Sequence, residues 1–167
     1  MDESFLVGRG RYADIHGNKN RMTAMLDHLK RVCEIADKYN FKPMMWSDMF
    51  FHIAGFDYRS DKLQEFTNEV IGLVPKNLDL IYWNYYTNDF KVFDAKRKTH
   101  KSFNNNVVFA GGAWSWTGIT PHNIYSILNN GAALKACAEN GIDDVIITEW
   151  KDDGAESSLF SVLPALM

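Results

Sequence analysis

Four short apolar runs, spaced at similar intervals along the chain, constrain its fold more than any other feature. The runs are centred near residues 44, 80, 108 and 146, and each has the length of a buried strand. The steps between these centres are 36, 28 and 38 residues, and each step contains one helical pattern. Apolar strands separated by single helices are typical of a parallel sheet covered by helices. The sequence therefore predicts an α/β fold built from successive βα units.

Signals at the ends of the helical patterns indicate where each unit starts and stops. Asn20 is a predicted N-cap, Pro75 stops the second helix, and Gly141 is a predicted C-terminal cap. The predicted helices span residues 20–40, 61–74, 89–103 and 123–139. The predicted strands span residues 42–46, 78–83, 107–110 and 144–148, and residues 4–20 are expected to form a loop.

Helical periodicity also predicts which side chains are buried. The apolar stripe of the first helix comprises Met22, Met25, Leu26, Leu29, Val32, Cys33 and Ala36, and that of the last helix Ile124, Ile127, Leu128, Leu134 and Ala138. Cys33 and Cys137 have no disulfide or metal spacing and are expected to be small core residues. The histidines show no metal-ligand spacing, so no metal and no cofactor is implied. All five are expected on the surface or in loops: His16, His28, His52, His100 and His122.

Aromatic and acidic residues recur just past the carboxyl end of each predicted strand, and all five tryptophans lie there. In a parallel α/β barrel these ends meet at one rim, which carries the active site. We therefore expect the side chains to lie close together. They are Trp46 with Asp48, Trp83 with Tyr85 and Tyr86, Trp114 with Trp116, and Trp150 with Asp152 and Asp153.

Such a rim favours a neutral sugar as its ligand. Aromatic faces pack on the C–H surfaces of sugars, and carboxylates accept hydrogen bonds from hydroxyl groups. The net charge is −3 and the basic residues are dispersed, so nothing predicts a nucleic-acid surface. No apolar run has the length of about 18 residues that a membrane span requires.

Three segments, in this order, resemble a known family. They are Asp2-Glu3-Ser4 with the following Gly8-Arg9-Gly10-Arg11-Tyr12, then residues 43–50 (PMMWSDMF), then residues 150–156 (WKDDGAE). On these segments the chain resembles glycoside hydrolase family 20, the β-N-acetylhexosaminidases, and especially the bacterial exo-β-N-acetylglucosaminidases. The resemblance implies a (β/α)8 barrel of the TIM type. Residues 1–167 would supply its C-terminal half, about strands five to eight with their helices.

The resemblance also implies hydrolysis of terminal non-reducing β-linked N-acetylglucosamine or N-acetylgalactosamine by a substrate-assisted retaining mechanism. The 2-acetamido oxygen of the substrate would attack the anomeric carbon and form an oxazolinium ion. Glu3 would protonate the leaving oxygen and later activate water, while Asp2 would orient the acetamido group and stabilise its positive charge. Two adjacent carboxyl groups suit these roles, because their mutual field favours keeping one proton.

Other sugar-binding positions follow from the same resemblance. Trp46, Trp114 and Trp150 fall where the family walls the acetamido pocket and stacks under the sugar. Tyr85 or Tyr86 would supply a hydroxyl to the acetamido oxygen. Strand parity places Tyr85 on the same face as Trp83, which favours Tyr85.

Two carboxylates have less defined roles. Asp152 takes the place of an acid that binds sugar hydroxyls in the family and is Glu in many members. Asp48 is either a pocket residue or a carboxylate that caps a loop.

A half-barrel leaves two strand edges exposed, so the chain is expected to associate with itself or with the missing N-terminal half. Both ends of the chain look cut, and an arginine that the family places on the first barrel strand has no counterpart. No secretion signal is visible, and the location is left between the cytoplasm and the surface of a bacterial cell.

Two other classes of function stay open at this level. The aromatic rim could belong to a non-catalytic carbohydrate-binding module in which Asp2 and Glu3 are incidental. The chain could also be a purely structural half-barrel. An inverting glycosidase on a related barrel would need a second carboxylate across the pocket, for which Asp48 and Asp152 are the candidates.

Overall fold

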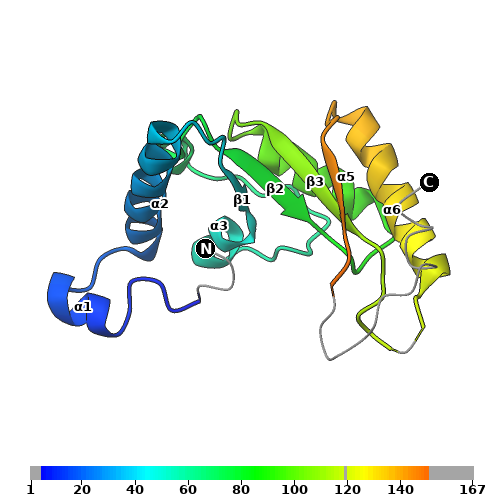
Figure 1. Cartoon of the computed structure of the whole chain (residues 1–167), viewed down its shortest axis with the longest axis horizontal. Coiled ribbons are helices and arrows are strands. Elements are labelled where there is room, and N and C mark those ends of the chain that lie inside the picture. Colours follow the sequence, from blue (N-terminus) through cyan, green and yellow to red (C-terminus); the bar gives the residue numbers. More distant parts are fainter. Residues whose placement is uncertain (1–4, 119, 151–167) are drawn as a thin grey trace.

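The computed structural model describes residues 5–118 and 120–150, which form one four-stranded parallel sheet with helices packed against it (Figure 1). Strand order in the sheet follows chain order, and each neighbouring pair is parallel. The predicted α/β fold with parallel strands is therefore confirmed. The strands are β1 (Met44–Trp46), β2 (Asp79–Trp83), β3 (Val107–Gly112) and β4 (Val145–Thr148).

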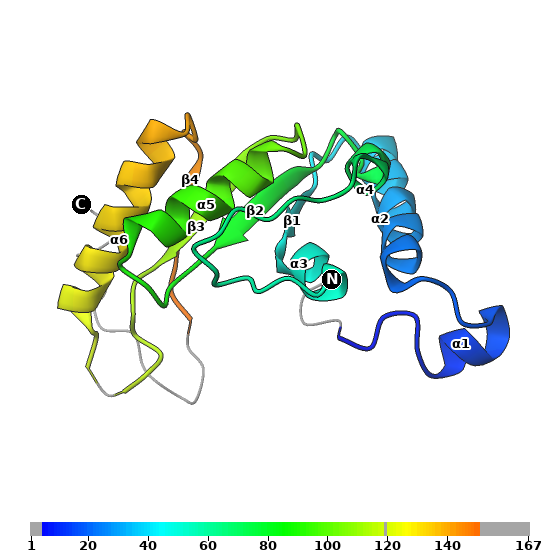
Figure 2. The ribbon, with the colours of Figure 1, turned by 180° about the vertical axis from the view of Figure 1, so that it is seen from behind.

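The helices of the described residues are α1 (Arg11–His16), α2 (Arg21–Lys38), α3 (Asp48–Ala54), α4 (Asn68–Leu73), α5 (Phe90–Lys101) and α6 (Asn123–Glu139). Helices α5 and α6 lie side by side on one face of the sheet (Figure 2), and α2 stands beside β1. Connections between parallel strands are right-handed, so a sheet whose strand order never reverses carries its connecting helices on one face.

The strands alternate their side chains between two environments. Leu80, Tyr82 and Phe109 point toward the helices and join the main core with residues of α2, α3 and α6. Ile81 and Val108 point the other way and form a smaller apolar cluster with Ala110, Trp46, Trp83 and Ile146. We call this second surface the inner face of the sheet.

Local capping explains most of the helix boundaries. The side chain of Asn20 accepts hydrogen bonds from the backbone N–H groups of Met22 (2.8 Å) and Thr23 (3.3 Å), as predicted for an N-cap. Asp89 caps α5 in the same way by accepting from the N–H of Lys91. Gly141 has a φ of 60° just past α6, the left-handed conformation that glycine adopts at low cost.

Two predicted segments are wrong. The expected loop at residues 4–20 contains the short helix α1, and the helix expected from residue 61 begins only at Asn68. Thr67 is its N-cap, accepting from the N–H of Val70. The preceding residues are held by α5 instead, because the backbone N–H of Gln64 donates to Thr99 Oγ1 at 3.1 Å.

The predicted apolar stripe of α6 is also wrong. Ile124 and Leu128 are exposed, whereas Ser126, Asn129 and Asn130 are buried. The buried polar side chains satisfy backbone groups of loops at the sheet, which periodicity of apolar residues does not reveal. In α2 the predicted stripe is correct except at Val32, which is exposed, and Ala36, which is half-buried.

Helix α5 carries charge into the core, and this contradicts the surface position expected for His100. Lys96, Arg97 and His100 are fully buried. The Arg97 guanidinium lies 4.3 Å from the ring centre of Phe109 and donates to Cys137 Sγ at 2.7 Å. Cys33 and Cys137 are free and buried, as predicted.

Candidate functional site

The carboxyl ends of the four strands bring all five tryptophans into one network of ring contacts. Trp150 reaches Trp46 (ring centres 6.0 Å apart) and Tyr85 (6.5 Å). Trp114 and Trp116 contact each other at 4.9 Å. We call the following set the aromatic cluster: Trp46, Trp83, Tyr85, Tyr86, Trp114, Trp116 and Trp150.

Tyr85 lies at the centre of the aromatic cluster and is only 5% exposed. Its ring stacks on Trp83 at 5.3 Å, as expected from strand parity, and meets the edge of Trp116 at 5.5 Å. It also contacts Tyr86 and Trp150. Tyr85 therefore links rings that follow three different strands, β2, β3 and β4.

The outer side of the aromatic cluster is more accessible. Tyr86 is 43% exposed, and the guanidinium of Arg59 lies 4.8 Å from its ring centre. Trp114 contacts Tyr86 at 5.3 Å and Tyr125 of α6 at 4.9 Å. Trp46, Trp83 and Trp114 are half-buried. Ring surface thus remains available at the edge of a packed aromatic floor.

Close approach at Gly112, the last residue of β3, makes this packing possible. A Cβ atom at Gly112 would lie 2.7 Å from Trp116 Cη2 and 2.9 Å from Tyr85 Cδ1. Real Cβ atoms do not come this close to rigid rings. Glycine is needed here because the two rings occupy the space of a side chain.

Polar residues of α6 hold the tryptophan-bearing loop after β3. The N–H of Trp114 donates to Ser126 Oγ at 2.9 Å, and Asn130 Nδ2 donates to the carbonyl of Gly112 at 3.1 Å. Asn129 Nδ2 donates to the carbonyl of Thr87, which fixes the loop after β2. The periodicity of apolar residues in the sequence does not reveal these polar residues. Their spacing with Ala133, Ala136 and Cys137, a stripe of small and amide side chains, is the signal that could have identified them.

Asp48 is buried at the carboxyl end of β1, where it is the first residue of α3. Its Oδ2 lies 3.8 Å from His52 Nε2. A carboxylate in the first helical turn interacts favourably with the helix dipole. The structure therefore places Asp48 at a helix start beside Trp46.

Ser47 and His100 anchor this segment to the neighbouring elements. Ser47 Oγ lies 2.8 Å from the carbonyl oxygen of Ile81 and 2.6 Å from His100 Nε2, while His100 Nδ1 lies 2.6 Å from the carbonyl oxygen of Lys96. Burial, with a smaller contribution from the nearby cations Arg97 and Lys96, lowers the pKa of His100 to about 3, although the hydrogen bond to the carbonyl of Lys96 acts in the opposite direction. The imidazole is therefore neutral. Its contacts connect the segment after β1 with β2 and α5.

Tyr58 extends the aromatic packing beneath Trp83. Its ring lies 5.3 Å from that of Trp83, and its Oη accepts from the Trp83 N–H at 3.3 Å. Complete burial, and then the nearby Tyr82, raise the pKa of Tyr58 well above its usual value. Tyr58 is a neutral phenol at any physiological pH.

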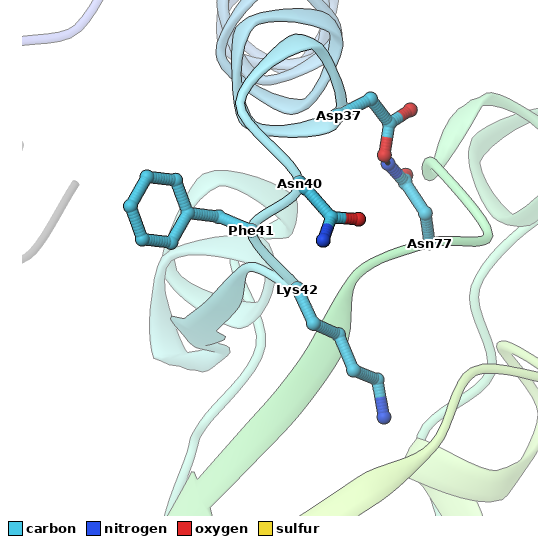
Figure 3. A pocket seen from close by; sticks show the side chains of 5 residues that line it. All are labelled: Asp37, Asn40, Phe41, Lys42 and Asn77. Carbon is cyan, nitrogen blue, oxygen red and sulfur yellow. Dashed lines mark hydrogen bonds between the residues drawn. The ribbon is translucent and has the colours of Figure 1, made fainter.

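A separate hollow of about 280 Å³ lies at the opposite, amino end of the sheet (Figure 3). It is lined by Asp37, Asn40, Phe41, Lys42 and Asn77, and the Phe41 ring points away from the others. Asn77 donates to Asp37 at 2.8 Å. Lys42 pairs with Asp79 at 2.9 Å, and the hollow is remote from the aromatic cluster.

Asp2, Glu3 and Asp152 lie outside the described residues. Within residues 5–118 and 120–150, no group of three or more His, Cys, Asp or Glu side chains could hold a metal ion. In the same part of the chain no helix has the length and apolar character needed to cross a membrane.

Comparison with known proteins adds no assignment. No protein-family model matches this sequence, and no curated protein matches it either.

Proposed function

We propose that this chain carries half of the active site of an exo-β-N-acetylhexosaminidase, with the sheet forming half of a (β/α)8 barrel. The observation that carries the proposal is the aromatic cluster, which joins all five tryptophans at the carboxyl ends of four parallel strands. Active sites of parallel barrels lie at this end. An aromatic floor with a neighbouring carboxylate, Asp48, suits a neutral sugar better than a charged ligand.

In this proposal the rings bind one N-acetylhexosamine unit. Trp46 and Trp150, whose rings contact each other, line the acetamido pocket. The Tyr85 hydroxyl donates a hydrogen bond to the acetamido oxygen. Tyr85 is preferred to Tyr86 because it contacts rings from three strand ends, whereas Tyr86 faces solvent beside Arg59.

Catalysis is assigned to the acidic pair. Glu3 is the general acid and then the general base, and Asp2 holds the 2-acetamido group so that its oxygen attacks the anomeric carbon. Asp152 binds sugar hydroxyls. No metal and no cofactor takes part in this scheme.

The test is hydrolysis of an aryl N-acetyl-β-glucosaminide by the chain alone and by the chain mixed with a polypeptide that supplies four further βα units. Glu3→Gln should reduce kcat by about 10²- to 10⁴-fold, because general acid catalysis contributes a factor of this size. The matched control is Glu34→Gln, which changes an exposed glutamate on α2. Equal activity of Glu3→Gln and Glu34→Gln in an active preparation would refute the role of Glu3.

Calorimetry with a thiazoline that mimics the oxazolinium ion separates catalysis from binding. Binding without turnover in any mixture would favour the non-catalytic carbohydrate-binding alternative. Absence of both would leave the structural half-barrel and remove the proposed site.

A further inference from the structure

Exposed apolar side chains gather at both outer edges of the sheet. Beside β1 these are Phe41 and Met44, which are 71% and 53% exposed, together with Val32 and Ile35 on α2. Beside β4 they include Val145 and, on α6, Ile127. An apolar border on each side of a sheet is typical of a surface that another chain covers.

Contacts on the opposite flanks of α2 and α6 indicate that Ile35 and Ile127 face outward, away from the middle of the sheet. Asp37 of α2 accepts a hydrogen bond from Asn77, which precedes β2, so this flank faces the middle of the sheet. Ile35, two residues earlier, lies on the opposite flank of a helix with about 3.6 residues per turn. Likewise Asn129 of α6 bonds to Thr87 before α5, and Ile127 lies on the opposite flank.

The register of the sheet indicates what kind of partner fits. Trp46, the last residue of β1, aligns through Ile81 and Val108 with Asp144. The last residue of β4 is Thr148, four residues beyond Asp144. Relative to the aligned residues, the strand ends therefore advance by four residues over the three steps from β1 to β4. A closed barrel of eight strands and shear 8 requires an average advance of one residue per strand, which is close to this value.

We propose that a second copy of this chain closes the sheet into an eight-stranded barrel, with β1 of each copy pairing in parallel with β4 of the other. A twofold axis along the barrel makes the two copies contribute equal halves of the shear, about four residues each. Within its own sheet, Met44 aligns with Ile142. A shift of four residues along β4 therefore places Met44 opposite Ile146 of the second copy.

The side chains in this register are compatible. Ile146 lies on the inner face with Trp46, and Met44 shares that face because it is two residues from Trp46. Trp46 falls opposite Thr148, and Lys42 falls opposite Asp144, which pairs opposite charges across the new seam. The carboxyl ends of all eight strands point the same way, so the two aromatic clusters would line one rim. This assembly rests on the half-barrel fold proposed above and does not depend on its sugar chemistry.

The first measurement is sedimentation equilibrium of the intact chain, which should give twice the 19.2 kDa of one copy. The second uses the paired substitutions Met44→Cys and Ile146→Cys, which should form a disulfide-linked dimer on mild oxidation. Within one copy these positions are three strands apart, roughly 14 Å across the sheet, and a further four residues apart along the strand direction, which is too far for a disulfide. The matched control combines Met44→Cys with Ile147→Cys, whose side chain points to the opposite face.

A dimer that is cross-linked by the 44/146 pair and left unlinked by the 44/147 pair supports the proposal. A monomer at all concentrations overturns it, and so does a dimer that both pairs cross-link equally or that neither cross-links. Circular dichroism confirms that each variant is folded. Ile35→Lys, at an exposed position, should raise the dissociation constant at least tenfold without loss of helix content, and an unchanged constant would also overturn the proposal. None of these measurements involves a sugar, so their failure is distinguishable from failure of the proposed enzyme activity.

Discussion

The two ends of the sheet are built from different chemistry. At the amino end, polar side chains bind one another: Lys42 pairs with the buried carboxylate of Asp79 at 2.9 Å, and Asn106 donates to Asp144 at 2.9 Å. At the carboxyl end, the rings of the aromatic cluster contact one another beside Asp48 and His52, whose Oδ2 and Nε2 atoms are 3.8 Å apart. The two ends therefore differ in their side chains: polar pairs are prominent at the amino end, whereas ring surface stays accessible at the carboxyl end, for example at Tyr86. The half-barrel that we propose predicts such a difference, because in parallel barrels the amino end serves stability and the carboxyl end carries the active site.

The largest expected difference between the two ends is at their tyrosines. Tyr85→Ala removes the ring at the centre of the aromatic cluster and should lower the free energy of unfolding by about 3–5 kcal/mol, the usual cost of truncating a buried aromatic ring. Tyr39→Ala, at an exposed site near the amino end, should change it by less than about 0.5 kcal/mol. Urea unfolding measures both. Tyr85→Phe keeps the ring and should keep most of the stability while weakening sugar binding.

Lowering the pH should reduce the free energy of unfolding through His100, which holds the segment at the carboxyl end of β1. Its pKa is near 3 in the folded chain against 6.5 for the free side chain, so the unfolded state binds more protons between these values. The contribution of His100 is therefore complete above pH 6.5 and is lost as the pH falls toward 3. Between pH 7 and 4.5 the loss should be on the order of 3 kcal/mol.

His100→Gln isolates this effect. The variant should show a flatter dependence of unfolding free energy on pH than the parent chain, measured by urea unfolding at pH 7 and 4.5. The control is His28→Gln at an exposed position of α2, which should follow the parent. Parallel curves for the parent and His100→Gln would show that the imidazole is not held neutral.

A smaller effect is expected at Gly112, which leaves space for the rings of Tyr85 and Trp116. Gly112→Ala should destabilise the chain by about 1–3 kcal/mol through overpacking, and should change the near-ultraviolet circular dichroism of the tryptophans. Gly131→Ala, where an added Cβ meets nothing within 4 Å, should stabilise α6 by about 0.5–1 kcal/mol. If both variants shift stability in the same direction, the close approach at Gly112 is not what limits the packing.

The smallest effect is expected at the amino end. Lys42→Met removes the pair with Asp79, in which the lysine is largely exposed. Because the lysine end of this pair is open to solvent, the pair is screened by salt and should contribute little, even though Asp79 is buried. The variant should differ slightly from the parent in low salt and should match it in about 1 M NaCl. A loss of unfolding free energy as large as that of Tyr85→Ala would contradict the contrast between the two ends.

Much of the fold could be predicted from the sequence because its signals are local. Asn20 caps a helix through its own neighbours, and Gly141 ends one through its own backbone conformation. Two of the failures share a cause, since they occur where distant contacts override a local pattern. Gln64 bonds to Thr99 of α5 instead of starting a helix, and His100 is buried by contacts with Ser47 and the carbonyl of Lys96.

The same division holds for the candidate site. The position of each tryptophan at the end of a strand or just past it follows from the sequence, and parallel strands bring their carboxyl ends to one edge. The sequence could not show that Tyr85 is the ring that links them, or that Asn129 and Asn130 are buried beneath the loops they hold. Asp2, Glu3 and Asp152 remain predictions.

The amino-acid sequence by itself determined the alternation of strands and helices and the end of the sheet at which aromatic residues collect. Both follow from apolar periodicity and caps, which act over a few residues. Only the tertiary structure decided which side chains touch, how far the strands are staggered, and which apolar flanks stay exposed at the edges. These depend on register and on contacts between residues far apart in the chain, where the free energy of each choice is set by packing.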